Sequence, residues 1–362
     1  MDYNNLNSLP SNPDIIECLS RPLTYTPFDV KWFPYSSKIV VAGQTSRSNG
    51  IVQIYNLLNG KLELFSEFLK SNGFKCMTFG SSSFASRDLA VGDFEGNLYV
   101  YDLERGSPSF EMKKAHKLII NAIDGIGGST NRKGPPEIVT ASRDGTAKVW
   151  DVRMKKQAML LDQHDKTAQH ECWAVSFGNA YSQSNRDVCL GYDNGDVKLF
   201  DIKMNKVIWE TNLKQGICSI EFDKKDCQMD KLAVTTLESK VVIFNMVTYH
   251  PELGFSYLND TVHSSTIWGT KFLPQNKDTF ISMGGNGGVS LYKYIYPMKK
   301  FILDENNMPK GNVGTLSIIK TKKISSQPIV GFDWHQEKTG LASLISLDNT
   351  LKVFYFTKLT TI

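Results

Sequence analysis

The stretch that decides the fold is EIVTASRDGTAKVWD, residues Glu137–Asp151. Two strand-length runs rich in β-branched residues flank Asp144-Gly145, and the second run ends in Trp150-Asp151. Asp-Gly tolerates positive φ at both of its positions, so the stretch predicts a β-hairpin with a type I′ turn. A single hairpin is common, and it becomes informative only if the same pattern recurs along the chain.

The hairpin pattern recurs seven times at a nearly constant period. Successive spacings between the aromatic residues that end the second strand are 46, 49, 50, 44, 48 and 62 residues, so only the last interval is stretched. These aromatic residues are Tyr55, Tyr101, Trp150, Phe200, Phe244, Tyr292 and Phe354. Five residues before each of them stand Gly50, Gly96, Gly145, Gly195, Ser239, Gly287 and Asn349. Turn residues repeated at this period are typical of β-propeller blades.

A third strand precedes each hairpin and alternates in character. Its last packing residue aligns as Trp32, Phe79, Gly125, Phe177, Phe222, Phe272 and Trp334. The residue before it is polar in every copy: Lys31, Thr78, Asp124, Ser176, Glu221, Lys271 and Asp333. Alternation places the packing residues on one face of the strand and the polar residues on the other. A strand that lines a narrow central channel requires this arrangement. The sequence therefore predicts an all-β fold, a seven-bladed β-propeller.

Composition agrees with one large soluble domain. Seven blades of about 45 residues use nearly all of the 362 residues. The formal charge of +4 gives no reason to expect nucleic acid or membrane as a partner. The six cysteines are scattered without paired metal-ligand spacing, which predicts free thiols in a reducing cytoplasm, no metal and no cofactor.

The two ends of the chain and one long interval complete the predicted organisation. Residues 1–13 are expected to be a flexible polar tail, and residues 14–362 a single propeller. The run DIIECLS (Asp14–Ser20) is expected to complete the last blade and close the ring, because little chain remains after Phe354. TLSIIKTKK is expected to form the outer strand of blade six, and the stretch 298–314 a disordered loop.

The phrase TASRDGTAKVWD resembles a WD repeat. The family usually places a His nine residues before the inner-strand anchor, and His116 and His263 stand there. The resemblance implies that His116, a strand hydroxyl (Thr140 or Ser142), Asp144 and Trp150 form a buried polar tetrad in blade three. Such a network rigidifies a blade only if every member is satisfied. Blade six has an incomplete version, with Asn286 and Tyr292.

The resemblance extends beyond single repeats. IINAIDGIGG (119–128), FGNAY (177–181), GYDNGDVKLFD (191–201), WETN (209–212) and SSQPI (325–329) are similar to a family of WD-repeat axonemal dynein assembly factors. That resemblance implies protein partners, namely axonemal dynein chains, a RuvB-like ATPase and a prefoldin-like cochaperone complex. It implies a cytoplasmic adaptor, a monomeric propeller within a larger complex.

The sequence itself supports a binding platform and not an enzyme. It contains no G-x-S-x-G, H-E-x-x-H or Walker A motif. Residues at the loops that enter the inner strands and before the hairpin turns are expected to share one protein-binding face. They are Phe28, Lys75, Phe94, Asn121, Arg143, Trp173, Asp193 and Trp268. Aromatic and cationic residues of this kind suit an adaptor surface. The alternative is a peptide reader, for example of methyl-lysine histone tails, with Phe28, Phe94, Trp173 and Trp268 as an aromatic cage.

Overall fold

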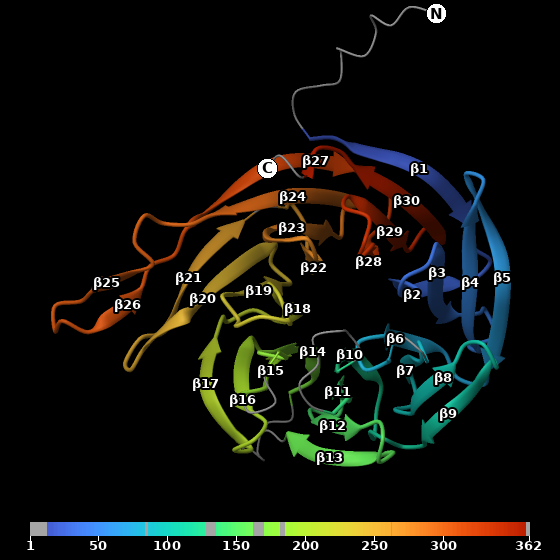
Figure 1. The fold of residues 1–362 in the computed structure, drawn as a ribbon, viewed down its shortest axis with the longest axis horizontal. Coiled ribbons are helices and arrows are strands. Elements are labelled where there is room, and N and C mark those ends of the chain that lie inside the picture. Colours follow the sequence, from blue (N-terminus) through green and yellow to red (C-terminus); the bar gives the residue numbers. More distant parts are fainter. Residues whose placement is uncertain are drawn as a thin grey trace, which may run out of the picture.

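The computed structural model describes residues 13–83, 86–127, 135–161, 170–181, 185–261 and 263–359. Seven four-stranded antiparallel sheets stand around a central axis and form a ring, the architecture of a seven-bladed β-propeller (Figure 1). This architecture confirms the fold that the repeated hairpins predicted. Six blades begin at the axis and run outward in chain order, while the seventh takes its outer strand from the start of the chain.

Blades are numbered in chain order, with strands given from the axis outward. Blade one is β2 (Thr26–Trp32), β3 (Lys38–Gln44), β4 (Gly50–Leu58) and β5 (Lys61–Lys70); blade two is β6 (Phe74–Thr78), β7 (Leu89–Asp93), β8 (Leu98–Asp102) and β9 (Ser107–Met112). Blade three is β10 (Ile120–Ile126), β11 (Glu137–Ser142), β12 (Ala147–Asp151) and β13 (Lys156–Leu161); blade four is β14 (Cys172–Gly178), β15 (Asp187–Tyr192), β16 (Asp196–Asp201) and β17 (Lys206–Asn212). Blade five is β18 (Ile217–Phe222), β19 (Lys231–Thr236), β20 (Lys240–His250) and β21 (Gly254–Thr261). Blade six is β22 (Ile267–Leu273), β23 (Asn276–Gly284), β24 (Gly288–Ile295) and β27 (Thr315–Lys323), as predicted for TLSIIKTKK; blade seven is β28 (Ile329–Trp334), β29 (Leu341–Ser346), β30 (Thr350–Phe356) and β1 (Ile15–Pro22).

The hydrophobic core lies between neighbouring blades. The aromatic residues that end the second hairpin strands are buried in all seven blades. Each cluster of buried side chains joins two successive blades; Val40 and Val52 of blade one, for example, pack with Met77 of blade two. A blade therefore buries its apolar faces only against its neighbours, and a closed ring gives every blade two of them.

The turn in blade three differs from the predicted type. Gly145 has a φ of +83°, whereas Asp144 has no positive φ. The amide of Gly145 donates to the carbonyl of Ser142 at 3.1 Å, and the amide of Ser142 donates to the carbonyl of Thr146 at 3.0 Å. These bonds define a three-residue loop, a type I turn followed by one left-handed residue. The hairpin was predicted correctly, but the type I′ assignment was wrong because only the glycine position needs positive φ.

Blade one places the same turn two residues earlier than the alignment suggested. Its left-handed residue is Ser48, with a φ of +66°, and the amide of Thr45 donates to the carbonyl of Asn49 at 2.9 Å. Gly50 instead opens β4, opposite Gln44. The alignment of Gly50 with Gly145 was therefore wrong, because both strands of this hairpin run farther before they turn.

The histidine, hydroxyl, carboxylate and indole of blade three form one buried network. Nε2 of His116 lies 2.7 Å from Oγ1 of Thr140, and the indole of Trp150 donates to the same oxygen at 2.9 Å. Nδ1 of His116 lies 3.4 Å from the carboxylate of Asp144. Burial lowers the pKa of His116, an effect that the nearby Asp144 partly offsets. All four groups have partners, which is the condition under which such a network stiffens a blade.

Thr140, and not Ser142, supplies the hydroxyl of this network. The hydroxyl of Ser142 donates to the carbonyl of Leu118 at 3.3 Å and accepts the amide of Asp144 at 3.1 Å. The two residues point to the same face because they are two positions apart. Ser142 ends β11 at the turn, about 7 Å farther along the strand, and therefore serves the loop and not the indole.

β1 belongs to the sheet that contains the last three strands. It pairs antiparallel with β30, from Ile15 opposite Phe356 to Pro22 opposite Thr350. Ile15 is fully buried, whereas the next residue, Ile16, is exposed. The outer strand of blade seven thus comes from the beginning of the chain. Residues 1–12 of the tail predicted at 1–13 lie outside the described residues.

The stretch 298–314, for which disorder was predicted, forms a hairpin. β25 (Phe301–Leu303) pairs antiparallel with β26 (Pro309–Gly311). Nδ2 of Asn245 in β20 donates to the carbonyl of Asn312 at 2.9 Å, and Nε2 of His250 lies 3.0 Å from the carboxylate of Asp304. The prediction was wrong because β20 extends beyond its blade and supports the hairpin. Figure 1 shows this hairpin, here termed the arm (residues 297–314), projecting from the ring.

Removal of Asp14–Ser20 is expected to lower the melting temperature strongly, because β30 would lose its outer partner. Ile15→Ala should by itself cost about 2–5 kcal/mol of unfolding free energy, as for a buried large-to-small change. Ile16→Ala, on the exposed side of the same strand, should stay within about 0.5 kcal/mol of the parent. Deletion of residues 1–12 is the control for truncation, and equal melting temperatures for both deletions would contradict the role of β1.

Asp144→Ala is expected to lower the unfolding free energy by about 1–3 kcal/mol, since buried His116 and two backbone amides would lose their acceptor. The carboxylate accepts the amides of Lys117 at 2.8 Å and Thr146 at 3.0 Å, besides its contact with His116. Urea denaturation followed by tryptophan fluorescence measures the loss.

Glu95→Ala and Glu238→Ala are the matched controls. Each removes one carboxylate from the turn position that aligns with Asp144, in blade two and in blade five. Glu95 pairs with Lys114 at 3.7 Å, and both of these side chains are exposed. Glu238 is likewise exposed. Each control should cost less than half the Asp144 effect, and three equal losses would argue against the tetrad.

Candidate protein-binding face

The two rows of residues predicted for the binding face lie next to one another in the structure. In blades two to seven, the first residue of the hairpin loop donates its amide to a carbonyl at the entrance of the inner strand. These pairs are Phe94 to Gly73, Arg143 to Ile119, Asp193 to Glu171, Leu237 to Gly216, Gly285 to Thr266 and Leu347 to Pro328, at 2.8–3.0 Å. The repeated bond places both rows on the same face of the ring, at the end where the chain enters each inner strand.

Phe28, Phe94 and Lys75 form one cluster across blades one and two. The rings of Phe28 and Phe94 meet edge to face with their centroids 5.1 Å apart, and Nζ of Lys75 lies 4.9 Å from the centroid of Phe28. All three side chains are half-buried. Burial lowers the pKa of Lys75. The cluster offers an aromatic surface that carries a cation held by the ring beneath it.

Arg143, Glu171 and Trp173 form a second cluster across blades three and four. Glu171 accepts a hydrogen bond from Nε of Arg143 at 2.7 Å and from the indole of Trp173 at 2.9 Å. The Arg143 side chain is 52% exposed. The Trp173 ring extends over Gly216 of blade five, where an added Cβ would lie 3.3 Å from it. Sequence reasoning missed Glu171, although its place two residues before Trp173 was a usable signal.

The remaining predicted face residues divide between exposed and structural roles. Trp268 is 44% exposed, and its indole nitrogen lies close to Gly285. Nδ2 of Asn121 donates to the carbonyl of Cys172 at 3.0 Å, which ties blade three to blade four. The Asp193 carboxylate lies 3.3 Å from Nδ1 of His170. The predicted set therefore does not converge on one point but occupies separate places around the ring.

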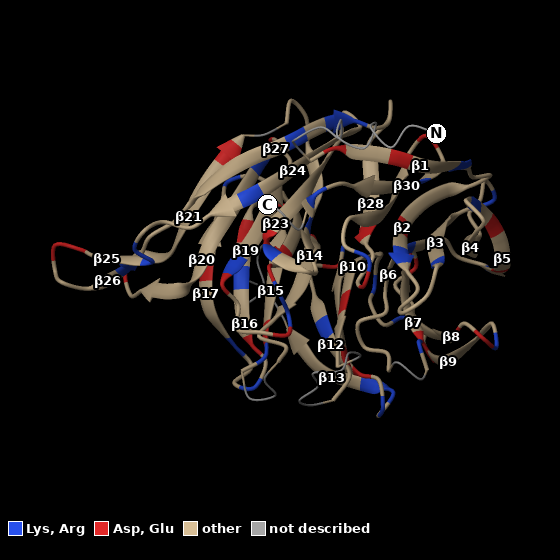
Figure 2. Cartoon of the chain, turned by 45° about the horizontal axis from the view of Figure 1, so that its top comes forward, with Lys and Arg blue, Asp and Glu red and all other residues tan. Residues whose placement is uncertain are grey.

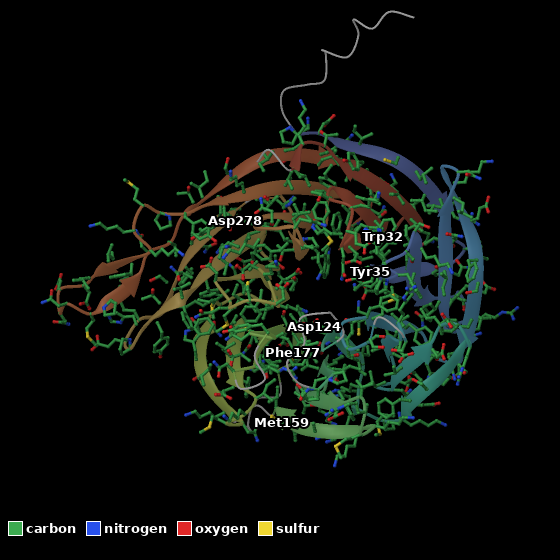
Figure 3. All side chains as sticks on the ribbon, viewed as in Figure 1. Trp32, Tyr35, Asp124, Met159, Phe177 and Asp278 are labelled. Carbon is green, nitrogen blue, oxygen red and sulfur yellow. The ribbon has the colours of Figure 1, made fainter. Side chains whose placement is uncertain are left out.

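The polar positions of the inner strands line a central channel. At the end of this channel that lies away from the entrances of the inner strands, a cavity of about 510 Å³ opens near Tyr35 and Gln336. Figure 3 shows Trp32, Tyr35 and Asp124 bordering the central opening. Trp32 is the last residue of β2 and Tyr35 follows it, so this opening lies at the end of the inner strands opposite the predicted binding face.

Carboxylates in the channel link three pairs of successive blades. Each accepts the backbone amide at the anchor position of the following inner strand. The pairs are Trp32 to Asp333 at 2.8 Å, Phe177 to Asp124 at 2.9 Å and Phe272 to Glu221 at 3.3 Å. Lysines neutralise two of these carboxylates: Nζ of Lys271 lies 2.7 Å from Glu221, and Lys225 bonds Asp124. The alternating pattern predicted polar channel positions, but it did not show which neighbour each would bind.

Asp333 binds its proton more tightly than a carboxyl group in water does. Burial raises its pKa to about 6, although Lys31, the Trp32 amide and Lys271 act in the opposite direction. Burial alone would lower the pKa of Lys271, but the neighbouring Glu221 carboxylate outweighs this effect. The pKa of Lys271 is therefore raised. Charges in the channel are thus largely balanced by one another.

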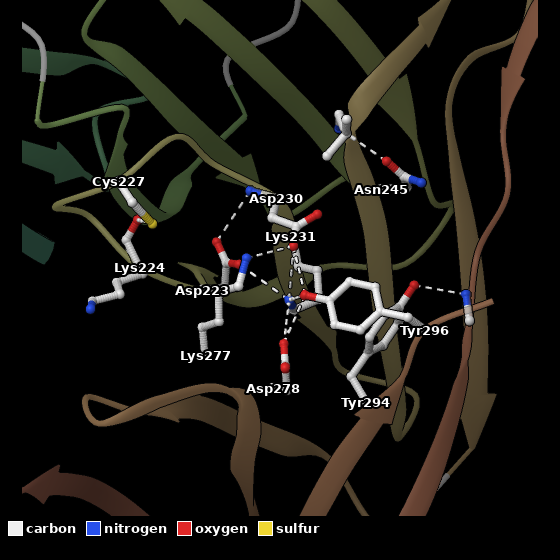
Figure 4. Close-up of polar contacts among 12 residues, drawn as sticks. Asp223, Lys224, Cys227, Asp230, Lys231, Asn245, Lys277, Asp278, Tyr294 and Tyr296 are labelled. Atoms are coloured by element: carbon white, nitrogen blue, oxygen red, sulfur yellow. Dashed lines mark hydrogen bonds and ion pairs between the residues drawn. The ribbon is translucent and has the colours of Figure 1, made fainter. Parts of the chain in front are cut away.

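A second buried polar cluster joins blades five and six around Lys231 (Figure 4). Nζ of Lys231 lies 3.0 Å from Asp278, 3.3 Å from Asp223 and 3.4 Å from Asp230. The hydroxyl of Tyr296 lies 2.6 Å from Asp230 and 2.7 Å from Asp278, and it donates its proton to one of these carboxylates. Tyr296 directly precedes the arm, so this cluster fixes the arm's base. Asp230-Lys231 before an apolar run was the only sequence signal for it.

The fold and the blade-three network define the class of this protein, a WD-repeat β-propeller. Among the described residues, no group of three His, Cys, Asp or Glu side chains is placed to hold a metal ion. The same residues contain no helix long and apolar enough to cross a membrane.

Comparison with known proteins narrows the class to one family. Dynein axonemal assembly factor 10 of Homo sapiens is 45% identical over 348 residues, which cover 96% of this chain and 98% of the human protein. The same-named protein of Xenopus tropicalis is 44% identical over 355 residues (98% and 99%), and that of Chlamydomonas reinhardtii 40% over 353 residues (97% and 99%). No protein-family model matches the chain. The chain belongs to the dynein axonemal assembly factor 10 family, also named Monad, which confirms the resemblance seen in its sequence.

Asp333→Asn is expected to raise the unfolding free energy relative to the parent protein, and to do so more at pH 7 than at pH 4. The folded pKa of about 6 lies above the unfolded value of about 3.9, so the folded state holds the proton more tightly. Asp333 therefore costs stability as the pH rises between these two values. Asparagine keeps an oxygen acceptor for the Trp32 amide without the charge. Urea denaturation at both pH values measures the change.

Asp124→Asn is the matched control, because Lys225 would lose the carboxylate that it binds. This variant should lose stability at pH 7. Equal losses of unfolding free energy for the two variants at pH 7 would contradict the raised pKa of Asp333.

Proposed function

We propose that this chain is a non-enzymatic protein-binding scaffold, a cytoplasmic cochaperone adaptor. In this role it brings axonemal dynein chains to a RuvB-like ATPase and a prefoldin-like complex. The name shared by its relatives, dynein axonemal assembly factor, supports a role in dynein assembly. The observation that carries the proposal is the pair of clusters Phe28–Lys75–Phe94 and Arg143–Glu171–Trp173, held on one face by neighbouring blades.

The chemistry of the face suits a protein partner. Aromatic and arginine side chains that are half-buried on their own protein lose little conformational entropy when a partner covers them. Trp268 adds an exposed indole on blade six. The ring holds these groups at fixed spacing, so a large partner can contact several blades at once.

The separation of the aromatic residues favours a broad surface over a methyl-lysine cage. A cage requires about three rings around one cation-sized space. Phe28 and Phe94 contact each other at the first two blades, whereas Trp173 lies over blade five and Trp268 beside Gly285 of blade six. Lys75 already occupies the space beside Phe28. The peptide-reader alternative therefore has less support than the scaffold.

Affinity purification from ciliated cells separates the two functions. The scaffold predicts axonemal dynein chains and RuvB-like ATPases in the eluate, quantified by mass spectrometry against a tag-only control. Enrichment of histones without these proteins would support the reader and contradict the scaffold.

A Phe94→Ala, Arg143→Ala double variant is expected to capture dynein chains and RuvB-like ATPases at least about tenfold less well. Loss of one aromatic or arginine anchor commonly costs about 2 kcal/mol of binding, and about 1.4 kcal/mol is tenfold. Its melting temperature should remain close to that of the parent, because both side chains flank an exposed turn.

A Phe65→Ala, Arg153→Ala double variant is the matched control, with the same two residue types removed. Phe65 lies on the outer strand β5 and Arg153 in the turn after β12, and both are exposed. It should retain capture, as should deletion of residues 298–314. Loss of capture on that deletion alone would place the partner on the arm and overturn the face assignment.

A further inference from the structure

The outer edge of β25 carries backbone groups without a strand partner among the described residues. The two-stranded sheet of the arm contains only β25 and β26, and β26 is the strand that packs against β20. The amide of Asn312 donates to the carbonyl of Lys300, and that of Asp304 to the carbonyl of Met308. Because backbone groups alternate in direction along an antiparallel strand, Phe301 and Leu303 point their N–H and C=O groups outward.

The side chains of β25 are apolar and exposed. Phe301, Ile302 and Leu303 are 52%, 46% and 58% exposed. Three consecutive exposed apolar residues on an unpaired edge are a template for strand pairing, which soluble proteins usually avoid. A partner strand would bury these side chains and pair the outward backbone groups of β25.

The charges that flank β25 indicate which strand could pair with its outer edge. The sequence KKFILDE places Lys299 and Lys300 before the strand and Asp304 and Glu305 after it. Figure 2 shows acidic residues at the tip of the arm and basic residues nearer the ring. Reversed in direction, the stretch is complementary to itself. Two antiparallel copies centred on Ile302 would place Lys299 opposite Glu305, Lys300 opposite Asp304 and Phe301 opposite Leu303.

We propose that β25 pairs with β25 of a second copy of this chain, joining two arms into a four-stranded sheet. The two-fold axis passes through the Ile302 pair. In this register the outward groups of Phe301 in one copy meet those of Leu303 in the other, which is the hydrogen-bonded position of an antiparallel pair. Four backbone hydrogen bonds and two Lys299–Glu305 ion pairs result, and each Phe301 packs beside a Leu303. The carboxylate of Asp304 stays with His250 of its own chain. Such a dimer replaces the monomer expected from the sequence, and it does not depend on the proposed function.

The arm is anchored firmly enough to present this edge. Tyr296 binds Asp230 and Asp278 at its base, Asn245 binds Asn312, and His250 binds Asp304 near its tip. These contacts hold β26 against blade five. They leave β25 as the outermost strand, away from the ring, where a second propeller can approach.

Sedimentation velocity over a range of concentrations from about 1 to about 300 µM tests the proposal, since a small edge interface predicts weak association. The parent protein should sediment increasingly as a dimer. Lys299→Glu places like charges at both 299–305 contacts, and so does Glu305→Lys. Each single variant should raise the dimer Kd at least about tenfold.

The charge-swapped variant Lys299→Glu, Glu305→Lys should dimerise like the parent. An equimolar mixture of the two single variants should form the mixed dimer, because each contact again joins opposite charges. Both side chains are exposed, so folding is unaffected, which circular dichroism checks. A parent that remains monomeric throughout, or single variants that dimerise like the parent, would overturn the proposal. A dimer that the double variant fails to restore would place the interface elsewhere.

Discussion

Hydrogen bonds between inner strands around a narrow channel fix three of the junctions between blades, the one that closes the ring among them. At this point polar side chains converge, and a buried carboxylate without a partner would be costly. Asp333, Asp124 and Glu221 each accept an anchor amide from the next blade. The same bond therefore satisfies a buried charge and sets the position of one blade against its neighbour. The pair from Asp333 to Trp32 joins blade seven to blade one, and thus links the end of the chain to its beginning.

The position of each blade against its neighbour brings together the side chains of the candidate binding face. Neither face cluster lies within a single blade: Phe28 meets Phe94 of the next blade, and Glu171 joins Arg143 to Trp173 across a blade boundary. The channel differs from this face in chemistry. Its carboxylates are held by amides and lysines of the same chain, whereas the cations and rings of the face remain partly exposed. A protein partner is therefore better served by the face than by the channel.

Local signals in the sequence were sufficient for the architecture and insufficient for the contacts between blades. A left-handed turn residue and a buried aromatic recur in every hairpin, so the number of blades could be predicted. Thr140 and Ser142 could not be distinguished, since both face the same side and only the position of Trp150 decides between them. The positions of the face residues were predicted, but their grouping was not. Grouping depends on Glu171 and on the angle between blades, which no local pattern encodes.

The arm shows how a propeller can gain a second surface without losing its ring. The insertion separates β24 from β27, yet these strands still pair from Gly288 opposite Lys323 to Ile295 opposite Thr315. Blade six is therefore complete, and the inserted residues are free to extend outward. Their support comes from blade five, through the long β20 and the Lys231 cluster. A pattern search within one repeat treats such residues as a loop, because the structure that orders them belongs to another repeat.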